Sequence, residues 1–531
     1  MTAPPRAIGV VGAGTMGAGI AQLACTAGAR TLVHDPVPEA LERGLESIDS
    51  RLRRGVERGR LSEEAARKAS ENLEKASSLT DLAPTELVIE AAPESLQIKR
   101  ELFATLSDGI VSADCVLATN TSSLLVTAIA AAVPNPGRVV GMHFFNPAPV
   151  MRLVELVAGA ESSPAALELA RAAGEAMGKH VIQACDGPGF LVNRCNRPFG
   201  LEALKLLQER LASLQEIDQI CRLGGGFRMG PFELMDLVGL DIGLDVSRSF
   251  YEQSFGEPRW RPSPITVRTI AAGRLGRKAG RGYYDYGADG HRLPDPDPPP
   301  VGGGDGAVVI AGDTPLARQL ADAATGAGWR VMTPHEADAE GAIAFLILNC
   351  GAGEEVEAPL QGGPLALCCA AGSLGALDPE GNAVGFHALP PLPSSRLVEL
   401  TRGPETADAA AAAAERFFGS LGKHTVWVGD APGLVLGRIV CQVINEAAFA
   451  LGEGIGSAAD IDAGMQHGLN YPRGILGWAD SIGLDHVLSV LDALAAELGE
   501  DRYRAAPVLR HLVWGARLGR PTGEGFFSYP D

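Results

Sequence analysis

The sequence has no CxxC pair, no long apolar run and no excess of positive charge, and each absence excludes a class of protein. Its nine cysteines are scattered, with only Cys368 and Cys369 adjacent. This pattern argues against a disulfide framework or a zinc site and favours a reducing compartment. No apolar run reaches the roughly 18 residues that a membrane span needs, and MTAPPR leads directly into a predicted strand, without room for a signal peptide. We therefore expect a soluble, cytoplasmic protein without a bound metal.

The net charge of −19 argues against nucleic acid or an anionic membrane surface as the main partner. An acidic protein that binds a polyanionic small ligand must gather its positive charge locally. The composition, 46% hydrophobic and 21% charged, is typical of globular proteins. A chain of 531 residues is too long for one hydrophobic core and predicts several domains.

The chain contains an internal duplication. HFFNPAPVMRLVEL begins at His143, and the similar HALPPLPSSRLVEL begins 244 residues later at His387. Near the end of each copy, RLGRKAGRGYYDY (274–286) corresponds to RLGRPTGEGFFSY (517–529). Agreement at a nearly constant offset over such a length indicates two copies of one structural unit.

Two kinds of region alternate along the chain. Apolar strands alternate with helical stretches from AIGVVG to LVELVA, which predicts a parallel sheet covered by helices. A wholly helical pattern follows, then a Pro- and Gly-rich segment that precludes a packed element, and then the order repeats. The expected fold is an α/β Rossmann-type domain plus an all-α C-terminal domain, duplicated, with the second copy degenerate. The expected boundaries are 1–185 and 186–286 for the first pair, 287–306 for the linker, and 307–429 and 430–531 for the second pair.

A glycine-rich turn, in IGVVGAGTMGAGIAQ (8–22), follows the first predicted strand. Gly12 permits the tight turn, Gly14 lets the backbone approach a pyrophosphate, and Gly17 lets helix and strand pack closely. Thr15 and Met16 belong to the same loop, at the helix N-terminus that would face the phosphates. Glycine-rich turns are common, so a purely structural turn is the alternative.

Asp35 favours a dinucleotide site over a structural turn. It ends the second predicted strand, 21 residues after Gly14, where a carboxylate would bind a ribose diol. The carboxylate would repel a 2′-phosphate and no arginine follows it, so we expect NAD as the cofactor rather than NADP.

His143 and Glu155 form a candidate catalytic pair. His143 ends a strand at the carboxyl edge of the sheet, where open α/β folds bind ligands, and Glu155 lies twelve residues further, in the next strand. An imidazole can take a proton from a hydroxyl group, and a carboxylate on its other nitrogen would fix the tautomer and stabilise the imidazolium. A structural histidine is the alternative, and the upstream nucleotide site disfavours it.

A series of motifs across residues 7–286 resembles the 3-hydroxyacyl-CoA dehydrogenase family. In order they are VGAGTMGAGIAQ, LVIEAAPESLQIKRELF, NTSSL, GMHFFNPAPVMRLVE, DGPGFLVNR, MGPFELMDLVGLD and LGRKAGRGYYDY. The resemblance implies that His143 is the base and Glu155 its partner, while Ser122 and Asn193 hold the substrate oxygen and the histidine. It also implies that four further residues join the glycine loop around NAD and the substrate: Glu94, Lys99, Asn146 and Lys278.

The reaction implied by this resemblance is the reversible, NAD-dependent oxidation of an (S)-3-hydroxyacyl-CoA to a 3-oxoacyl-CoA, as in the β-oxidation of fatty acids. The duplicated form resembles bacterial enzymes that act on 3-hydroxybutyryl-CoA or on 3-hydroxyadipyl-CoA. The apolar turn residues Ala148, Val150 and Met151 suit a short aliphatic chain slightly better. A dehydrogenase of a free hydroxy or sugar acid is the main rival. A binding-only relative would tend to lose the catalytic residues that this chain retains.

Five arginines are concentrated in RLRRGVERGR (51–60), on a predicted helix. CoA has several phosphate charges, and members of the family bind them near this helical hairpin. Arg51, Arg54 and Arg58 are therefore expected to bind the substrate, although a solvated charged face is the alternative. A free-acid dehydrogenase would not need this cluster.

The second copy has lost most of the site. Its His387 and Glu399 survive, but the counterparts of the binding residues are changed: Gly14 to Thr314, Gly17 to Ala317, Asp35 to His335, Ser122 to Gly372, Asn146 to Pro390, Asn193 to Gly437 and Lys278 to Pro521. We expect it not to be a dehydrogenase. Single-copy members of the family pair through their helical domains, so the second copy is expected to supply that partner in cis, as an intramolecular pseudo-dimer. Further oligomerisation stays open.

Overall fold

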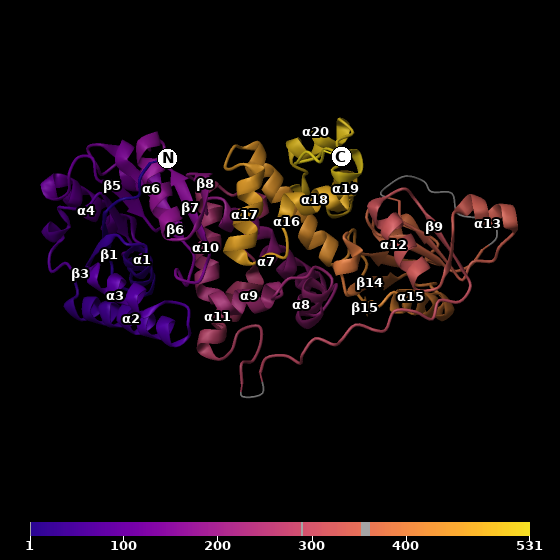
Figure 1. The fold of residues 1–531 in the computed structure, drawn as a ribbon. Helices are drawn as coiled ribbons and strands as arrows, with labels where there is room; N and C mark the ends of the chain where they lie inside the picture. The colour runs from indigo at the N-terminus through magenta and orange to yellow at the C-terminus, as the bar shows by residue number, and fades with distance from the viewer. Residues whose placement is uncertain (1, 288–289, 352–361, 531) are drawn as a thin grey trace. The chain divides into compact units, whose positions relative to one another are not determined.

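The structure, a computed structural model, describes residues 2–287, 290–351 and 362–530. Residues 288–289 of the predicted linker and 352–361 of the second α/β region lie outside this description. The chain forms two compact units: Met1–Arg194 with Gly454–Leu469, and Cys195–Glu453 with Asn470–Asp531. Figure 1 shows the course of the chain from its N-terminus to its C-terminus. Within the described ranges, no helix is both long and apolar enough to cross a membrane.

The first unit is built on an eight-stranded sheet in the order β3-β2-β1-β4-β5-β6-β7-β8. Its strands are β1 (Ala7–Val11), β2 (Arg30–His34), β3 (Leu73–Lys75), β4 (Leu87–Glu90), β5 (Val116–Thr119), β6 (Val139–Phe144), β7 (Leu153–Ala158) and β8 (His180–Cys185). The central strands β1, β4 and β5 are buried along their whole length, as expected for a sheet that helices cover on both faces.

One strand pair departs from the predicted parallel sheet. β6 and β7 are antiparallel neighbours, whereas the other neighbours in this sheet are parallel. The connection at 145–152 is too short for the crossover that parallel strands require. The hairpin places His143 directly opposite Glu155.

The helices of the first unit are α1 (Thr15–Thr26), α2 (Pro38–Glu57), α3 (Glu63–Glu71), α4 (Leu96–Thr105), α5 (Val126–Ala130), α6 (Pro164–Ala176) and α17 (Ala458–Leu469). α17 comes from the second copy, yet it packs on β7 and β8 of the first. Its glycines make this approach possible: a Cβ at Gly464 would lie 3.0 Å from a methyl carbon of Ile182 in β8, and one at Gly468 would lie 2.7 Å from Leu153 in β7. The first copy's sheet is thus partly covered by the second copy.

The second unit contains a seven-stranded sheet in the order β10-β9-β11-β12-β13-β14-β15. Its strands are β9 (Ala307–Ala311), β10 (Arg330–Met332), β11 (Leu346–Asn349), β12 (Leu365–Cys368), β13 (Val384–His387), β14 (Leu397–Arg402) and β15 (His424–Trp427). A single helix, α13 (Pro334–Glu340), lies between β10 and β11, where the first copy has α2, α3 and β3. Between β10 and β11, where every residue is described, the second copy therefore has no counterpart of the arginine-rich helical hairpin.

The other helices are α7 (Val192–Glu209), whose first residues belong to the first unit, α8 (Leu214–Leu223), α9 (Pro231–Val238), α10 (Leu240–Gln253), α11 (Pro264–Ala271), α12 (Pro315–Gly326), α14 (Leu374–Leu377), α15 (Asp408–Ser420), α16 (Leu436–Gly452), α18 (Ile475–Ile482), α19 (Leu484–Leu498) and α20 (Pro507–Trp514). α8 of the first copy packs against β14 of the second, and the Arg396 N–H donates to the Leu223 carbonyl at 2.8 Å. α8 and α17 occupy corresponding positions in the two copies, so the exchange of helices between copies is reciprocal.

The helical segments of the two copies also share a buried ion pair. Arg438 of α16 is fully buried, and its Nε lies 2.6 Å from Glu202 of α7, which is equally buried. The same guanidinium donates to Glu209 at 2.6 Å and to the Tyr503 hydroxyl at 2.7 Å. A buried charge without a partner is costly, so separating these residues would be unfavourable. The ion pair therefore holds segments of both copies together within the second unit.

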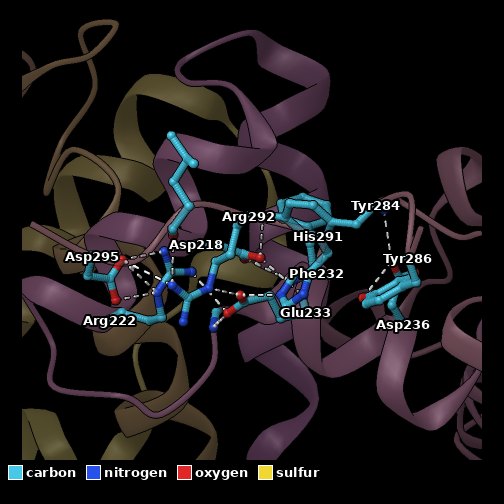
Figure 2. Close-up of polar contacts among 12 residues, drawn as sticks. Asp218, Arg222, Phe232, Glu233, Asp236, Tyr284, Tyr286, His291, Arg292 and Asp295 are labelled. Carbon is cyan, nitrogen blue, oxygen red and sulfur yellow. Dashed lines mark hydrogen bonds and ion pairs between the residues drawn. The ribbon is translucent and has the colours of Figure 1, made fainter. Parts of the chain in front are cut away.

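The described part of the linker contains no helix or strand up to β9, but ion pairs hold it against the first copy's helices (Figure 2). Asp295 accepts from Arg222 of α8 at 2.8 Å, and Arg292 donates to Glu233 of α9 at 2.6 Å. Glu233 also accepts from Arg222 at 2.9 Å. The part of the linker that the structure describes thus lacks a helix or strand and is nevertheless held in place by ion pairs.

The repeated GYYDY and GFFSY motifs have a structural explanation. In the first copy, Asp236 accepts hydrogen bonds from the backbone N–H groups of Tyr283 and Tyr284, each at 2.9 Å, and from the Tyr286 hydroxyl. In the second copy, Asp480 makes the same three kinds of contact with Phe526, Phe527 and Tyr529. Burial raises the pKa of both aspartates. The motif therefore closes the helical segment around a buried carboxylate in both copies.

Candidate active site

The glycine turn of the first copy leaves the N-terminus of α1 open. Gly12 has φ +99°, and a Cβ there would lie 2.6 Å from the Ala91 carbonyl oxygen. A Cβ at Gly17 would lie 1.7 Å from the Gly12 carbonyl oxygen, so no larger residue fits. Gly14 is the N-cap, makes no side-chain cap and has nothing within 4 Å of its Cβ position. The free backbone N–H groups at Thr15 and Met16 can therefore face a pyrophosphate.

Asp35 lies beside this turn. Its carboxylate accepts from the backbone N–H of Ala13 at 2.8 Å and from that of Val37 at 2.9 Å. A pocket of about 240 Å³ is lined by the glycine turn, α1 and α2, with Gly14, Arg43 and Arg51 among its residues. The residues present fit the pyrophosphate and adenosine ribose of NAD.

His143 and Glu155 form a buried pair. The His143 Nδ1 lies 2.6 Å from a Glu155 carboxylate oxygen, and the two side chains are 8% and 0% exposed. The other Glu155 oxygen accepts from the backbone N–H groups of Leu191 and Val192 at the start of α7. This arrangement keeps a proton on Nδ1 and leaves Nε2 to exchange a proton with a ligand.

Ser122 lies in a loop that Glu94 fixes. One Glu94 oxygen accepts from the backbone N–H groups of Ser122 at 3.0 Å and Ser123 at 3.1 Å, and from the Thr121 hydroxyl at 2.6 Å. Burial opposes ionisation, but the charge of Lys99 and these hydrogen bonds lower the pKa of Glu94 below its usual value. Glu94 is therefore a carboxylate that holds the serine loop.

The other predicted residues are not all brought together. Asn193 is the second residue of α7, next to Val192, and Asn146 is exposed just after β6. Lys99 is 1% exposed and ion-paired to Glu90 at 2.6 Å, so it faces inward rather than toward solvent. Lys278 belongs to the second unit, where its Nζ lies 2.6 Å from Asp241.

Three of the five clustered arginines predicted to bind CoA, Arg51, Arg54 and Arg58, line one pocket of about 400 Å³. Arg60 lines it too, and its apolar lining includes Leu52, Leu61, Pro149 and Val150. Arg53 points elsewhere and pairs with Asp49 at 2.6 Å. Charge and apolar surface in one pocket suit a ligand with both phosphates and a flat ring.

The apolar turn residues expected to suit a short aliphatic chain do not all face the same surface. Ala148 is 2% exposed and packs against α1, where a Cβ at Gly19 would lie 3.2 Å from it. Val150 is 69% exposed and lines the arginine pocket instead. The two side chains point in different directions because the backbone turns within this segment. The apolar turn therefore gives no support for a short acyl chain.

The surviving histidine of the second copy has lost its carboxylate partner. His387 and Glu399 are still opposite each other in the sheet, but no hydrogen bond joins them among the described residues. The His387 Nε2 instead lies 3.1 Å from the Nε2 of His486, and both rings are buried. A Cβ at Gly437 would lie 2.2 Å from the His387 ring, so the ring occupies the space that a side chain like Asn193 would need.

Burial shifts the pKa values of His387 and Glu399 in directions that do not suit acid–base catalysis. Burial and the neighbouring His486 lower the pKa of His387 well below its usual value. Burial also raises the pKa of Glu399 to about 8, despite its hydrogen bonds from the backbone N–H groups of Val435 and Leu436. Both groups are thus disposed to be neutral and are closed to a ligand.

The second copy also closes its own phosphate turn. The Thr314 hydroxyl caps α12 by accepting from the Ala317 N–H at 3.1 Å, and it donates to the Cys350 carbonyl. Asp313 places a negative charge beside the turn and pairs with Arg318. A capped helix N-terminus next to a carboxylate is unsuited to a pyrophosphate.

Two family models match the chain, each of them twice. The 3-hydroxyacyl-CoA dehydrogenase NAD binding domain matches residues 7–187 and 374–431, and the C-terminal domain of the same family matches 189–286 and 433–529. The second NAD-domain match begins beyond the altered turn at Thr314.

Relatives of the whole chain have the same double length. A 3-hydroxyadipyl-CoA dehydrogenase of Escherichia coli K12 is 34% identical over 95% of this chain and 97% of its own length. The crystal structure of 3-hydroxybutyryl-CoA dehydrogenase from Escherichia coli K12 matches with a TM-score of 0.80 and 32% identity, over 97% of this chain and 99% of that one. A 3-hydroxybutyryl-CoA dehydrogenase of Bradyrhizobium diazoefficiens is 38% identical and matches 54% of this chain with 97% of its own length.

A nucleotide turn, a buried histidine–carboxylate pair and these matches define an NAD-dependent oxidoreductase. The chain belongs to the 3-hydroxyacyl-CoA dehydrogenase family, with the family's two domains present twice. The predicted family and fold class are confirmed, as is the choice of NAD as cofactor.

Proposed function

We propose that the first copy alone catalyses the reversible oxidation of a short-chain (S)-3-hydroxyacyl-CoA to the 3-oxoacyl-CoA. The buried His143–Glu155 pair supports this proposal most strongly, because it is intact only in the copy whose glycine turn is open. The glycine turn would hold NAD, whose nicotinamide ring would supply the acceptor for the hydride of the carbinol carbon. The cofactor-binding residues proposed are those of the glycine turn, Asp35, Glu94, Lys99, Asn146 and Lys278.

In this proposal, His143 Nε2 takes the hydroxyl proton as the carbonyl forms. The imidazolium keeps its second proton on Nδ1, against the Glu155 carboxylate 2.6 Å away. The Leu191 and Val192 N–H groups hold that carboxylate in place. The Ser122 hydroxyl and Asn193 hold the substrate oxygen and the histidine, and a second donor on this oxygen polarises it in the transition state.

We propose that the arginine pocket binds the phosphate groups of CoA through Arg51, Arg54 and Arg58. The protein has a net charge of −19, so a local cluster of positive charge is needed to attract a polyanion. The apolar residues in the same pocket provide a surface for the adenine ring. A free hydroxy acid would have no use for this site, which disfavours the free-acid rival.

Two acyl groups are candidates for the substrate. Several relatives are named as 3-hydroxybutyryl-CoA dehydrogenases, and this supports a short aliphatic chain as the first candidate. The full-length relative named as a 3-hydroxyadipyl-CoA dehydrogenase supports that substrate as the second candidate.

We propose that the second copy serves as a structural partner in cis, giving an intramolecular pseudo-dimer within the boundaries 1–185, 186–286, 287–306, 307–429 and 430–531. The reciprocal packing of α17 and α8 on the sheet of the other copy supports this role. Nine free cysteine thiols support a reducing, cytoplasmic location.

A pair of matched variants tests the assignment. His143→Ala should lower kcat for acetoacetyl-CoA with NADH by roughly 10²–10⁴, the usual contribution of a general acid–base, and leave NADH affinity nearly unchanged. His387→Ala should leave kcat unchanged, and NADH titration should give one site per chain. A rate with 3-hydroxyadipyl-CoA comparable to that with acetoacetyl-CoA would favour the adipyl substrate. A comparable rate with a free 3-hydroxy acid would favour the free-acid dehydrogenase. A His143→Ala enzyme within tenfold of wild type would refute the proposal.

A further inference from the structure

Glu90 is a fully buried carboxylate at the carboxyl end of β4, outside the set of residues assigned above. One oxygen accepts from the Ala92 backbone N–H and from the Lys99 ammonium, each at 2.6 Å. The other accepts from the Thr119 hydroxyl of β5, also at 2.6 Å. The side chain therefore joins the end of one strand, the turn after it, the next strand and α4.

A row of charges leads from Glu90 to the serine loop. The Lys99 ammonium, paired with Glu90, lies 3.4 Å from the second oxygen of Glu94. The first oxygen of Glu94 accepts from the backbone N–H of Ser122. Because Lys99 is 1% exposed, these two carboxylates rather than water compensate the charge of its ammonium group.

The second copy shows what this position needs for folding alone. Asn349 ends β11 and has the same register against β9 as Glu90 has against β1. Its side-chain oxygen accepts from the Gly351 N–H at 3.0 Å, just as Glu90 accepts from Ala92 two residues on. The neighbour in the next strand is Leu367 where the first copy has Thr119. A neutral amide is thus enough to hold the strand end, and the negative charge is present only in the first copy.

We propose that Glu90 is a positioning residue for the reaction, whose charge holds Lys99 so that Glu94 can fix the Ser122 loop. This inference rests on the proposed function of the first copy's site. Without the Glu90 charge, the buried ammonium has Glu94 as its single counter-charge in this row and draws that carboxylate away from the backbone N–H groups of Ser122 and Ser123. The serine hydroxyl is then displaced from the oxygen it should hold.

Glu90→Gln tests this inference because it removes the charge and keeps the shape. The amide oxygen can still accept from Ala92, and the amide N–H can donate to the Thr119 hydroxyl. In the variant without ligands, the backbone amides of residues 122–123 should exchange with deuterated solvent at least severalfold faster. The kcat should fall by about ten- to a hundredfold, the cost of a displaced catalytic group, with the KM for acyl-CoA little changed.

A double-variant measurement separates charge from fold. In the Lys99→Met background, Glu90→Gln should have little additional effect on kcat, since the two residues act through one another. Glu86→Gln is the matched control: this carboxylate precedes the same strand and accepts from the Arg6 N–H at 2.6 Å.

Wild-type exchange at 122–123 together with a wild-type kcat in Glu90→Gln would overturn the inference. A loss of rate that adds fully to that of Lys99→Met would do the same. Because the exchange measurement uses the protein without ligands, it reports on Glu90 even if His143→Ala shows that the proposed site is wrong.

Discussion

Replacing Glu155 by Gln removes one negative charge from a fully buried position and keeps the size of the side chain. The Gln carbonyl will take over the two backbone N–H groups of Leu191 and Val192, which leaves its amide group facing His143 Nδ1. An amide N–H donates to Nδ1 rather than accepting from it. The ring proton then lies on Nε2, where the substrate proton should go, so the variant holds the wrong tautomer.

The expected loss follows from the geometry. An imidazolium and a carboxylate whose nearest atoms are 2.6 Å apart have charge centres roughly 4 Å apart, which corresponds to about 4 kcal/mol at an effective dielectric constant of 20. Each 1.36 kcal/mol is a factor of about ten in rate. If the imidazolium is fully formed in the transition state, Glu155→Gln should lower kcat about a thousandfold.

The assay is the reduction of acetoacetyl-CoA, followed through NADH absorbance, with NADH affinity measured separately by fluorescence. The affinity should stay close to wild type, because Glu155 does not line the glycine-turn pocket. Glu399→Gln is the internal control at the same position of the second copy and should leave kcat unchanged. A Glu155→Gln enzyme within tenfold of wild-type kcat would show that the imidazolium does not need this carboxylate.

Three other predictions concern binding and stability. Changing Arg51, Arg54 and Arg58 to Ala together should raise the KM for acyl-CoA at least tenfold and weaken its salt dependence, while Arg53→Ala should not; an unchanged KM would leave the cluster as a solvated face. Glu399 has a raised folded pKa of about 8, so its contribution to stability falls as pH rises from about 4.5 toward 8. Glu399→Gln should therefore raise the melting temperature more at pH 8 than at pH 5, and an equal change at both would contradict the assignment. Truncation after residue 290 removes α17 from β7 and β8 and should give self-association in sedimentation, whereas a fully active monomer would refute the structural role of the second copy.

Local features were predictable from the sequence because one stretch of chain determines them. The glycine turn follows from three steric requirements within six residues, and the structure gives each glycine the close contact or open approach that the motif demands. The duplication likewise predicted two sheets and two sets of helices. The antiparallel β6–β7 pair follows from the short connection between these strands. The alternation of strands and helices along the chain does not by itself predict this pair.

Features that depend on packing between distant segments were not predictable. The role of Glu90 needs the alignment of β4 with β5 and the inward direction of Lys99. The inward turn of His387 depends on Gly437 and His486, neither of which resembles a catalytic residue in the sequence. Ala148 and Val150 look alike as apolar turn residues, yet one lies in the core and the other in the arginine pocket.

The reciprocal exchange of α8 and α17 has a consequence for how the chain can change. In a homodimer one gene encodes both subunits, so no substitution can damage one active site and spare the other. A single chain with both copies escapes this constraint. One half can contain Thr314 and Gly437 while the other half keeps Gly14 and Asn193. If the second half acts as the proposed structural partner, it must preserve the surface of α17 that packs on β7 and β8, whereas its histidine can change.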